Sequence, residues 1–478
     1  MTALDLARWQ FGFTIAFHIV FPSLSIGLAA WLALIEAMWV KTADESWLRL
    51  SRWWTGIFAM IFGMGVVSGV VLSYQFGTNW GGFSTFAGPV TGPLLSWEVL
   101  TAFFLEAGFL GVMLFGRNRV SPRVQLAATV MVSIGTLISA TWILSANSWI
   151  QTPRGIDVVD GHVVPLDWWA ILFNPSFPYR LVHMVLGAFL ASALFVAAAG
   201  AWRIFVGRDG EAERRSLSMG LWALIVLAPL QIFAGDSHGL NTLRHQPAKI
   251  AAIEGHWRNE PGEGVPLVLF ALPDMATETN RWAVEIPRLG SLILTHSFSG
   301  SVPALTDFPR DDRPNATIVF WAFRVMVGLG LAMLGLGLSG LVLRRNGALF
   351  RNRTFLAATI AMGPAGIVAV LAGWMTTEIG RQPWAVWGLL RTADAVTPHP
   401  VVDVAIGLAF FVVVYFVVFG AGILQVLRLI AHGPRAAVLA AAENTADDAR
   451  PARPMSAAPD HESAPTSRHD TKDTEGAP

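Results

Sequence analysis

The sequence contains no cysteine and little charge. Of its 478 residues, 14% are Asp, Glu, Lys or Arg, and these cancel to a formal net charge of zero. The lack of cysteine excludes disulfides, iron–sulfur clusters, c-type haem attachment and thiolate metal sites. A chain without excess positive charge offers no argument for a nucleic-acid partner. Any metal must therefore be held by His, Met, Asp or Glu.

Two sequence patterns are also missing. No internal repeat is evident, although inverted repeats are typical of many transporters. The first apolar segment is much longer than the hydrophobic region of a signal peptide and has no basic stretch before it, so we expect no cleavable signal. What the sequence does contain is apolar: 54% of the residues are hydrophobic, with 20 Trp and 30 Phe. This composition is typical of a polytopic membrane protein.

Nine apolar runs are each long enough to cross a bilayer, which takes about 20 residues. We therefore predict an all-α integral membrane protein whose residues 1–435 form nine transmembrane helices in bundles. Residues 236–315 form a long loop, and residues 436–478 lack periodicity and are predicted to be a disordered tail. The predicted spans are approximately 11–39, 53–77, 94–116, 124–147, 180–206, 217–235, 316–343, 354–377 and 403–431.

Basic residues divide the loops into two classes. The loops after the first, third, fifth and seventh spans are rich in Arg and Lys, as is the segment after the ninth. The alternate loops are poor in them, and residues 78–93 carry no charge at all. By the positive-inside rule, the N-terminus lies outside and the C-terminus, with its tail, lies in the cytoplasm.

Two histidines and one methionine are candidate ligands. Of 11 histidines, only His18 and His183 fall inside predicted spans. A lone histidine in the membrane often makes a helix–helix hydrogen bond, and the alternative is haem ligation. Met326 would ordinarily fill core space. The adjacent Arg324, however, needs an anionic partner in the membrane, and a haem propionate would serve.

Three glutamates belong to predicted spans. Glu98 and Glu106 lie eight residues apart in one helix, which predicts a separation of about 12 Å and about 80° in azimuth. Such a pair indicates a proton path or a buried metal environment, and the alternative is a structural ion pair with a basic residue. We expect Glu36 to be an interfacial residue.

The stretch from Gly373 to Trp384 ends the eighth apolar run with Glu378 and Arg381. A carboxylate at the centre of a membrane helix costs about 2.5–3.5 kcal/mol, so its presence predicts a function. The topology places most of the costly residues toward the outer side, which favours a single site there. Only Glu106 reaches deeper, which suits a connection to the cytoplasm. The residues on the outer side are His18, Glu98, His183, Arg324, Met326, Glu378 and Arg381.

At these residues the chain resembles subunit I of the cytochrome bd-type quinol oxidases, over about residues 1–430. The short outer loop is similar to that of the cyanide-insensitive branch of the family. The matching segments are Arg8-Trp9-Gln10-Phe11 with His18, Trp97-Glu98 with Glu106, His183, Gly235-Asp236 to Gln246-Pro247-Ala248-Lys249 with Glu254, Phe320 to Met326, and Gly373 to Trp384.

The resemblance implies three haems. A low-spin haem b would be held by His183 and Met326, and two high-spin haems would be held near His18 and Glu378, with Glu98 close by. One high-spin haem is of b type, and the other is haem d or a b-type replacement. Arg324 and Arg381 would meet haem propionates, and Trp374 would pack against haem. The residues implied for the quinol site in the loop are Lys249 and Glu254.

The implied function is that of a terminal respiratory oxidase subunit in the bacterial inner membrane. It would oxidise ubiquinol or menaquinol at the outer face and reduce O2 to water. Protons would come from the cytoplasm through the catalytic carboxylates Glu98 and Glu106, which builds a gradient without pumping. The implied partners are subunit II, as a heterodimer, and small single-helix subunits.

Other classes of membrane protein explain less of the sequence. The main alternative is a proton-coupled transporter without haem, and a structural or assembly protein is another. Neither explains the clustering of ionisable residues at one depth. Haem–copper oxidases and bc-type cytochromes b need more helical histidines than the predicted spans contain.

Overall fold

The computed structural model describes residues 1–259 and 262–447. Within this part of the chain, nine helical segments are long and apolar enough to cross a membrane, which confirms the predicted number. Two of the nine are interrupted: α3 and α4 are joined by the π-helix η1, and α12 and α13 by a short turn. The segments are α1 (Ala3–Thr42), α2 (Glu45–Thr78), α3 (Gly81–Glu98) with η1 (Val99–Phe103) and α4 (Phe104–Phe115), α5 (Pro122–Gln151), α7 (Phe177–Phe205), α8 (Glu211–His245), α11 (Ala316–Arg345), α12 (Arg353–Met362) with α13 (Ala365–Ile379), and α15 (Val401–Asp447).

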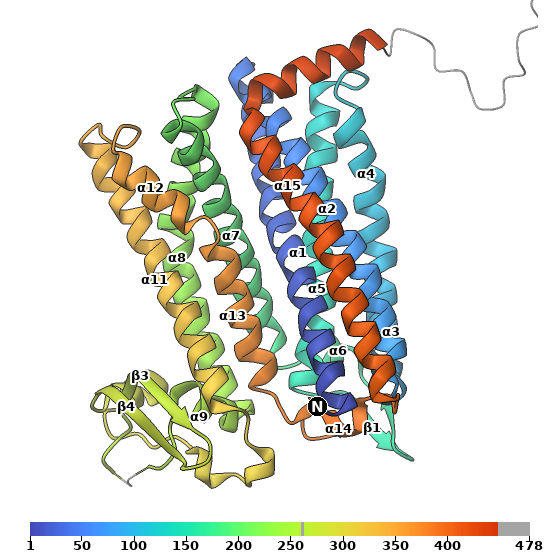
Figure 1. The fold of residues 1–478 in the computed structure, drawn as a ribbon, viewed down its shortest axis with the longest axis vertical. Helices are drawn as coiled ribbons and strands as arrows, with labels where there is room; N and C mark the ends of the chain where they lie inside the picture. The colour runs from blue at the N-terminus through green and yellow to red at the C-terminus, as the bar shows by residue number, and fades with distance from the viewer. Residues whose placement is uncertain (260–261, 448–478) are drawn as a thin grey trace, which may run out of the picture. The chain divides into compact units, whose positions relative to one another are not determined.

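The shorter elements lie at the end of the bundle from which α1 starts (Figure 1). We call this end the loop-rich face. Its three small sheets are antiparallel two-stranded hairpins. The elements are β1 (Ile156–Val159), β2 (His162–Pro165), α6 (Trp168–Leu172), α9 (Pro247–Glu254), β3 (Leu267–Asp274), β4 (Thr279–Ile286), α10 (Leu289–Thr295), the 3-10 turns η2 (Leu305–Asp307) and η3 (Arg310–Asp312), β5 (Trp384–Val386), β6 (Leu390–Arg391) and α14 (Thr392–Ala395).

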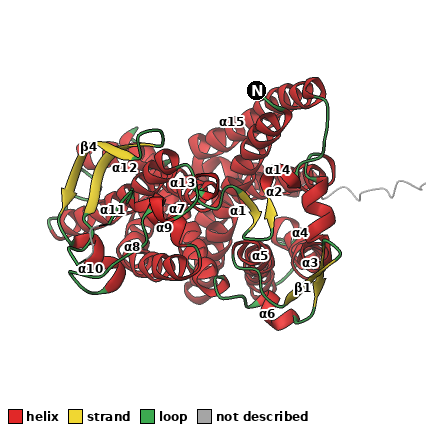
Figure 2. Ribbon diagram, turned by 90° about the horizontal axis from the view of Figure 1, so that it is seen from below, coloured by secondary structure: helices red, strands yellow, loops and turns green. Residues whose placement is uncertain are grey.

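The long helices form two groups that pack side by side (Figure 2). One group contains α1, α2, α3 with α4, α5 and α15, around a core that includes Trp54, Phe58 and Leu28. The other contains α7, α8, α11, α12 and α13, around Leu194 and Leu221. Helices α1 and α5 also pack against α7, which joins the two groups.

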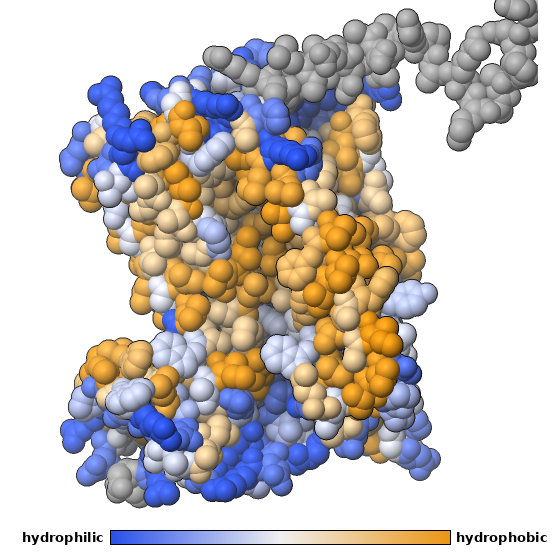
Figure 3. Space-filling model, viewed as in Figure 1, coloured by the Kyte–Doolittle hydropathy of each residue, from blue (hydrophilic) through white to orange (hydrophobic). Residues whose placement is uncertain are grey.

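The surface shown in Figure 3 has an apolar middle and hydrophilic ends. Side chains of α15 such as Ile406, Phe410, Val413 and Phe416 are exposed. Exposed aliphatic and aromatic residues at this density are stable only against lipid or another apolar surface. The chain is therefore a multi-pass membrane protein.

The segment predicted as a long outer loop is folded. Helix α8 continues ten residues past the predicted end of the sixth span, to His245. After it come α9, the β3–β4 hairpin and α10, packed on a small core that includes Ile253, Trp257, Leu294 and Leu305. The predicted boundary at residue 236 was therefore too early, because polar residues near the helix end face protein rather than lipid.

Residues 78–93 were predicted to be a loop, and this prediction was wrong. Helix α3 begins at Gly81 and contains Pro89 and Pro93. Membrane helices tolerate proline when neighbouring helices satisfy the freed backbone groups. Ala87, Val90 and Leu94 recur at helical spacing and are buried with Trp149 of α5. Packing against α5 therefore outweighs the Gly- and Pro-rich composition.

Helix α15 is kinked near its C-terminal end. Its backbone departs from helical geometry at Gly433, where φ is 75°, and is helical again up to Asp447. The predicted disordered tail begins at residue 436, and its residues 448–478 lie outside the part of the chain that the structure describes.

Candidate functional site

The predicted ligands His183 and Met326 lie on two helices of a four-helix arrangement formed by α7, α8, α11 and α13. Each lies against a glycine of a neighbouring helix. A Cβ atom on Gly235 of α8 would be 3.2 Å from His183 Cε1, and one on Gly373 of α13 would be 2.7 Å from Met326 Sδ. We call these four residues the glycine-backed cluster. The two glycines leave room for the ligand side chains that any larger residue would fill.

His183 has two polar neighbours on α8. Gln231 Nε2 is 3.2 Å from His183 Nδ1, and the ring of His238 packs edge-on with its centroid 5.5 Å from that of His183. His238 lies inside α8, so the prediction that only two histidines belong to spans was wrong. The count of helical histidines therefore no longer excludes a bc-type cytochrome b.

The carboxylate of Glu378 is surrounded by donors from α5, α7 and the turn that follows α13. Arg381 Nη2 is 2.7 Å from one oxygen. The other oxygen accepts from Asn147 Nδ2 at 3.0 Å and Gln151 Nε2 at 3.2 Å, and Arg180 Nη2 is 3.7 Å away. We call these five residues the charged cluster. Its two guanidinium groups offset the cost of burying the carboxylate.

Both arginines of the charged cluster have N–H donors that no described residue accepts from. Within the described residues, Arg381 Nε and Nη1 and Arg180 Nε are buried and have no hydrogen-bond partner. Buried cationic N–H groups are costly unless an anion meets them. A haem propionate supplies such an anion, so the donor set beside Glu378 fits the prediction made for Arg381.

His18 of α1 is held by α2. Its Nδ1 is 3.0 Å from Ser68 Oγ. Because the Ser68 hydroxyl donates its proton to the carbonyl oxygen of Gly65, its oxygen accepts from His18 Nδ1–H. The lone pair of the ring is then on Nε2, the arrangement found when a histidine binds a metal and its other nitrogen is fixed by a hydrogen bond.

Glu98 and Glu106 face the same stripe of α5. Glu98 Oε1 accepts from Ser139 Oγ at 2.7 Å, and Glu106 Cγ would be 2.5 Å from a Cβ on Gly135. Ser139 and Gly135 are one turn apart. The predicted azimuthal difference of about 80° was wrong because η1 widens one turn. Such a π-turn holds about one extra residue, which takes about 100° off the rotation between the two carboxylates and reduces the difference to roughly 20°.

Glu36 was expected to be an interfacial residue, and the structure adds that it is enclosed by protein. Its side chain is fully buried. It pairs with Arg117 Nη2 at 2.6 Å and accepts from Ser51 Oγ at 2.8 Å and Thr129 Oγ1 at 2.6 Å. The loop after α4 brings Arg117 back to it, so Glu36 ties α1 to the basic end of the bundle.

Helix α9 brings the two predicted loop residues into the protein interior. Lys249 Nζ donates to Gln151 Oε1 at 2.6 Å, and burial holds the pKa of Lys249 well below its ordinary value, with Arg180 lowering it further. At the other end of α9, Glu254 Oε2 is 3.1 Å from Arg324 Nη2. Lys249 is therefore not a solvated loop residue.

Arg324 is bound by protein groups. It donates to the carbonyl oxygens of Ile253 at 2.7 Å and Val268 at 2.6 Å, and its guanidinium packs 4.1 Å from the Phe320 ring centroid. With Glu254 these partners take up all three of its nitrogens. The predicted contact with a haem propionate is therefore better suited to Arg381 than to Arg324.

Two further residues of the predicted motifs, Trp374 and Arg8, lie outside the clusters described above. Trp374 lies on α13 and is half-buried. Arg8 Nη2 donates to Gln382 Oε1 at 2.6 Å, so the N-terminal motif meets the stretch that follows Glu378.

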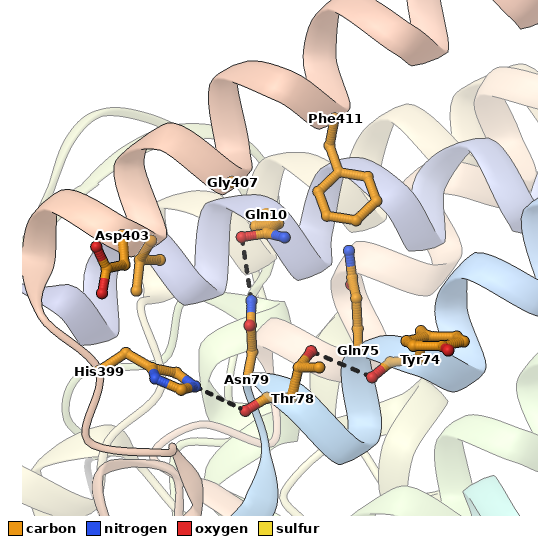
Figure 4. A pocket seen from close by; sticks show the side chains of 10 residues that line it. Gln10, Tyr74, Gln75, Thr78, Asn79, His399, Asp403, Gly407 and Phe411 are labelled. Carbon is orange, nitrogen blue, oxygen red and sulfur yellow. Dashed lines mark hydrogen bonds between the residues drawn. The ribbon is translucent and has the colours of Figure 1, made fainter.

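A cavity of about 260 Å³ lies between α1, α2 and α15 at the loop-rich face. Gln10, Gln75 and Asn79 line it together with His399 and Asp403 (Figure 4). The residues predicted to bind haem or quinol do not line it. The ligand clusters are therefore defined by their side-chain contacts and not by this cavity.

Comparison with known proteins decides the family. The family model described as cytochrome bd terminal oxidase subunit I matches residues 6–434. This chain belongs to that family. As a member of it, the chain is a haem-bearing membrane subunit of a terminal oxidase complex, which confirms the resemblance seen in the sequence.

Individual members of the cytochrome bd family agree with this assignment. Cytochrome bd-II ubiquinol oxidase subunit 1 of Escherichia coli (strain K12) is 31% identical over 461 residues, which cover 82% of this chain and 89% of the relative. Cytochrome bd ubiquinol oxidase subunit 1 of Bacillus subtilis (strain 168) is 32% identical over 408 residues, covering 84% and 87%. The solved structure of bd oxidase from Geobacillus thermodenitrificans has a TM-score of 0.83 at 28% identity and covers 90% of this chain and 98% of its own.

Sequence reasoning missed several polar residues that surround the predicted cytochrome bd ligands. Asn147 and Gln151 lie one turn apart at the end of α5; Asn147 is the last residue of the span predicted there, and Gln151 lies past it. Arg180 stands three residues before His183, and an arginine inside a membrane helix was itself a usable signal. Ser68, Gln231 and Ser139 carry no such signal, because Ser and Gln are common in helix interfaces.

Proposed function

We propose that this chain is the haem-bearing catalytic subunit of a quinol:oxygen oxidoreductase in a bacterial inner membrane. The observation that carries the proposal is the charged cluster: a buried carboxylate whose neighbouring arginines have unpartnered donors. In a family of haem-bearing oxidases, these donors suit an iron ligand beside haem propionates. Haem supplies reversible one-electron chemistry and an iron that can bind O2 when one position is open.

We assign the ligands by donor type. The neutral pair His183 and Met326 would hold the low-spin haem b, since two strong protein ligands leave no open position. His18, through Nε2, and Glu378 would each hold a high-spin haem, one of b type and the other haem d or a b-type replacement. Arg381 would bind a propionate, and Trp374 on the same helix would pack against haem.

The quinol would bind at α9. Lys249 and Glu254, five residues apart on α9, are the groups assigned there. Lys249 would hydrogen-bond a quinone oxygen, and Glu254 would accept a proton released on oxidation. The buried Lys249 has little competition from solvent. Arg324 fixes the carboxylate of Glu254, so that it acts from a defined position.

Glu98 and Glu106 would carry protons from the cytoplasm toward the site of O2 reduction. Their common orientation toward α5 supports this role, because a proton is passed more readily between groups on one face. With the N-terminus outside, quinol protons leave outside and water-forming protons enter from inside. A gradient then builds up without pumping.

The complex would contain subunit II as a heterodimer partner, with small single-helix subunits as further candidates. The substrates would be ubiquinol or menaquinol and O2. We do not favour a proton-coupled transporter, because the family assignment and the unpartnered arginine donors both suit a haem protein.

The test is a reduced-minus-oxidised absorption spectrum of the purified membrane complex. We expect bands from low-spin and high-spin haem, and a broad red band only if haem d is present. His183→Ala should remove the low-spin bands and leave the high-spin bands. A complex with intact subunits and no haem bands would overturn the proposal.

A further inference from the structure

Helix α9 is fixed to the transmembrane helices at both of its ends. All residues from Ala248 to Glu254 are buried. At its start, Gln246 Nε2 donates to the backbone oxygen of Gln151 at 3.0 Å. At its end, Arg324 holds both Glu254 and the backbone oxygen of Ile253. A ligand that binds at α9 must therefore change contacts to these helices.

One glutamine connects α9 to Glu378. Gln151 Oε1 accepts from Lys249 Nζ at 2.6 Å, and Gln151 Nε2 donates to Glu378 Oε1 at 3.2 Å. The orientation of the amide follows from its partners, because a carboxylate only accepts hydrogen bonds. Gln151 is therefore the single residue between the assigned quinol residue and the assigned iron ligand.

The lysine stem in this chain has little freedom. A Cβ on Gly380 would be 2.8 Å from Lys249 Cγ, so the stem lies directly on the backbone just after Glu378. Lys249 itself is 3% exposed. Movement of its amine toward a bound ligand must then be made by the end of the side chain, which is the part that contacts Gln151.

We propose that Gln151 is a positioning residue that couples occupancy of the quinol site to the ligand strength of Glu378. When a quinone oxygen accepts from Lys249 Nζ, Gln151 loses its partner and its amide is free to turn. Glu378 Oε1 then loses or lengthens one hydrogen bond, which changes its donation to iron. The inference rests on the proposed function, and it assigns to that site a form of control by substrate.

The experiment uses the purified complex, oxidised and with all haems bound. Decylubiquinone is added, and electron paramagnetic resonance records the high-spin and low-spin ferric signals. We expect the quinone to change the symmetry of a high-spin signal in the unmodified complex. Gln151→Leu removes both the amide oxygen and the amide nitrogen at nearly constant size. In this variant we expect the response to quinone to be lost while the high-spin signal itself remains.

Gln125→Leu is the matched control. Gln125 is a buried glutamine in the same helix, and its amide donates to the backbone oxygen of Met113, away from the charged cluster. This variant should keep the full response. Gln151→Asn keeps the amide but is one carbon shorter, so its response to quinone should be reduced. If Gln151→Leu fails to assemble, Gln151→Asn tests the role of Gln151 in its place.

The outcomes are distinct. A full response in Gln151→Leu or Gln151→Asn would overturn the inference, as would the lack of any quinone response in the unmodified complex with its haems in place. Loss of the response in Gln125→Leu would also overturn it, since any buried glutamine of α5 would then have the same effect. An unmodified complex without haem signals would instead overturn the proposed function.

Discussion

The glycine-backed cluster and the charged cluster share one bundle but are built on different physical principles. The first combines the neutral donors His183 and Met326 with glycines that leave space. The second surrounds Glu378 with two arginines and two amides. Neutral donors such as His and Met have a small transfer free energy into a membrane interior, so their main requirement is space for the side chain. A carboxylate costs far more and requires partners for its charge.

The comparison teaches that the two clusters should fail differently. Added volume should disrupt the glycine-backed cluster, whereas loss of charge should disrupt the charged cluster. His18 is intermediate, because it is a neutral ligand whose ring donates a hydrogen bond to Ser68 Oγ that fixes its orientation. Substitutions that separate volume from charge can therefore test the comparison.

The largest effect is expected from Glu378→Ala. This change leaves Arg381 and Arg180 buried without their carboxylate, which typically costs about 3–5 kcal/mol. Thermal unfolding of the detergent-solubilised complex should show the loss of stability, and one high-spin haem signal should disappear. Glu285→Ala, at an exposed glutamate of β4, is the control and should change neither. A stable Glu378→Ala complex with both high-spin signals would contradict the assignment.

Gly373→Ala should come next. The new Cβ would be 2.7 Å from Met326 Sδ, so the methionine side chain must move. We expect a cost of about 1–3 kcal/mol and conversion of the low-spin signal to a high-spin form. Gly328→Ala on α11 is the control, because a Cβ there would meet open space. An unchanged low-spin spectrum in Gly373→Ala would show that Met326 is not a ligand.

Met326→Leu separates ligation from packing. Leucine nearly preserves the volume, so the expected loss of stability is below about 1.5 kcal/mol. The low-spin bands should nevertheless vanish, because leucine has no donor atom. Met333→Leu, at a buried methionine two turns further along α11, should keep both stability and spectrum. Retention of the low-spin bands in Met326→Leu would contradict the pairing with His183.

Ser68→Ala should have the smallest effect. It removes the acceptor of the hydrogen bond that His18 Nδ1 donates, and the expected loss of stability is about 1 kcal/mol. The haem assigned to His18 should bind about 10–100-fold more weakly, as is usual when the partner of a metal-bound histidine is lost. Haem retention during dialysis against apomyoglobin measures this. Ser73→Ala in the same helix is the control, at an exposed serine whose hydroxyl donates to the backbone oxygen of Gly69 one turn earlier. Equal haem loss in both variants would count against the role of Ser68.

Much of the fold follows from composition and spacing. Nine long apolar runs separated by short polar loops lead to nine helices, because each backbone group in lipid must be satisfied within its own segment. The prediction of helix ends was wrong where polar or proline-rich segments pack against protein. Residues 81–93 and 236–245 are helical because Ala87, Val90 and Leu94 in one case, and His238 in the other, pack against neighbouring helices.

The candidate site was only partly predictable. The residue types of His18, His183, Met326 and Glu378 stand out in a membrane sequence because each carries a donor that lipid does not satisfy. Their partners do not stand out. Gln151 is an ordinary polar residue until α9 brings Lys249 to one side of its amide and α13 brings Glu378 to the other.

By itself, the sequence determined that this membrane protein has nine segments apolar and long enough to cross a bilayer, which the described residues form as helices. It also determined which side chains are too costly to be there by chance. Both results follow from local transfer free energies, which depend on residue type and segment length. Only the tertiary structure decided which of these side chains meet. One π-turn brings Glu98 and Glu106 to a common face, and one buried loop helix links Lys249 to Glu378, because contacts between distant segments depend on helix phase and packing.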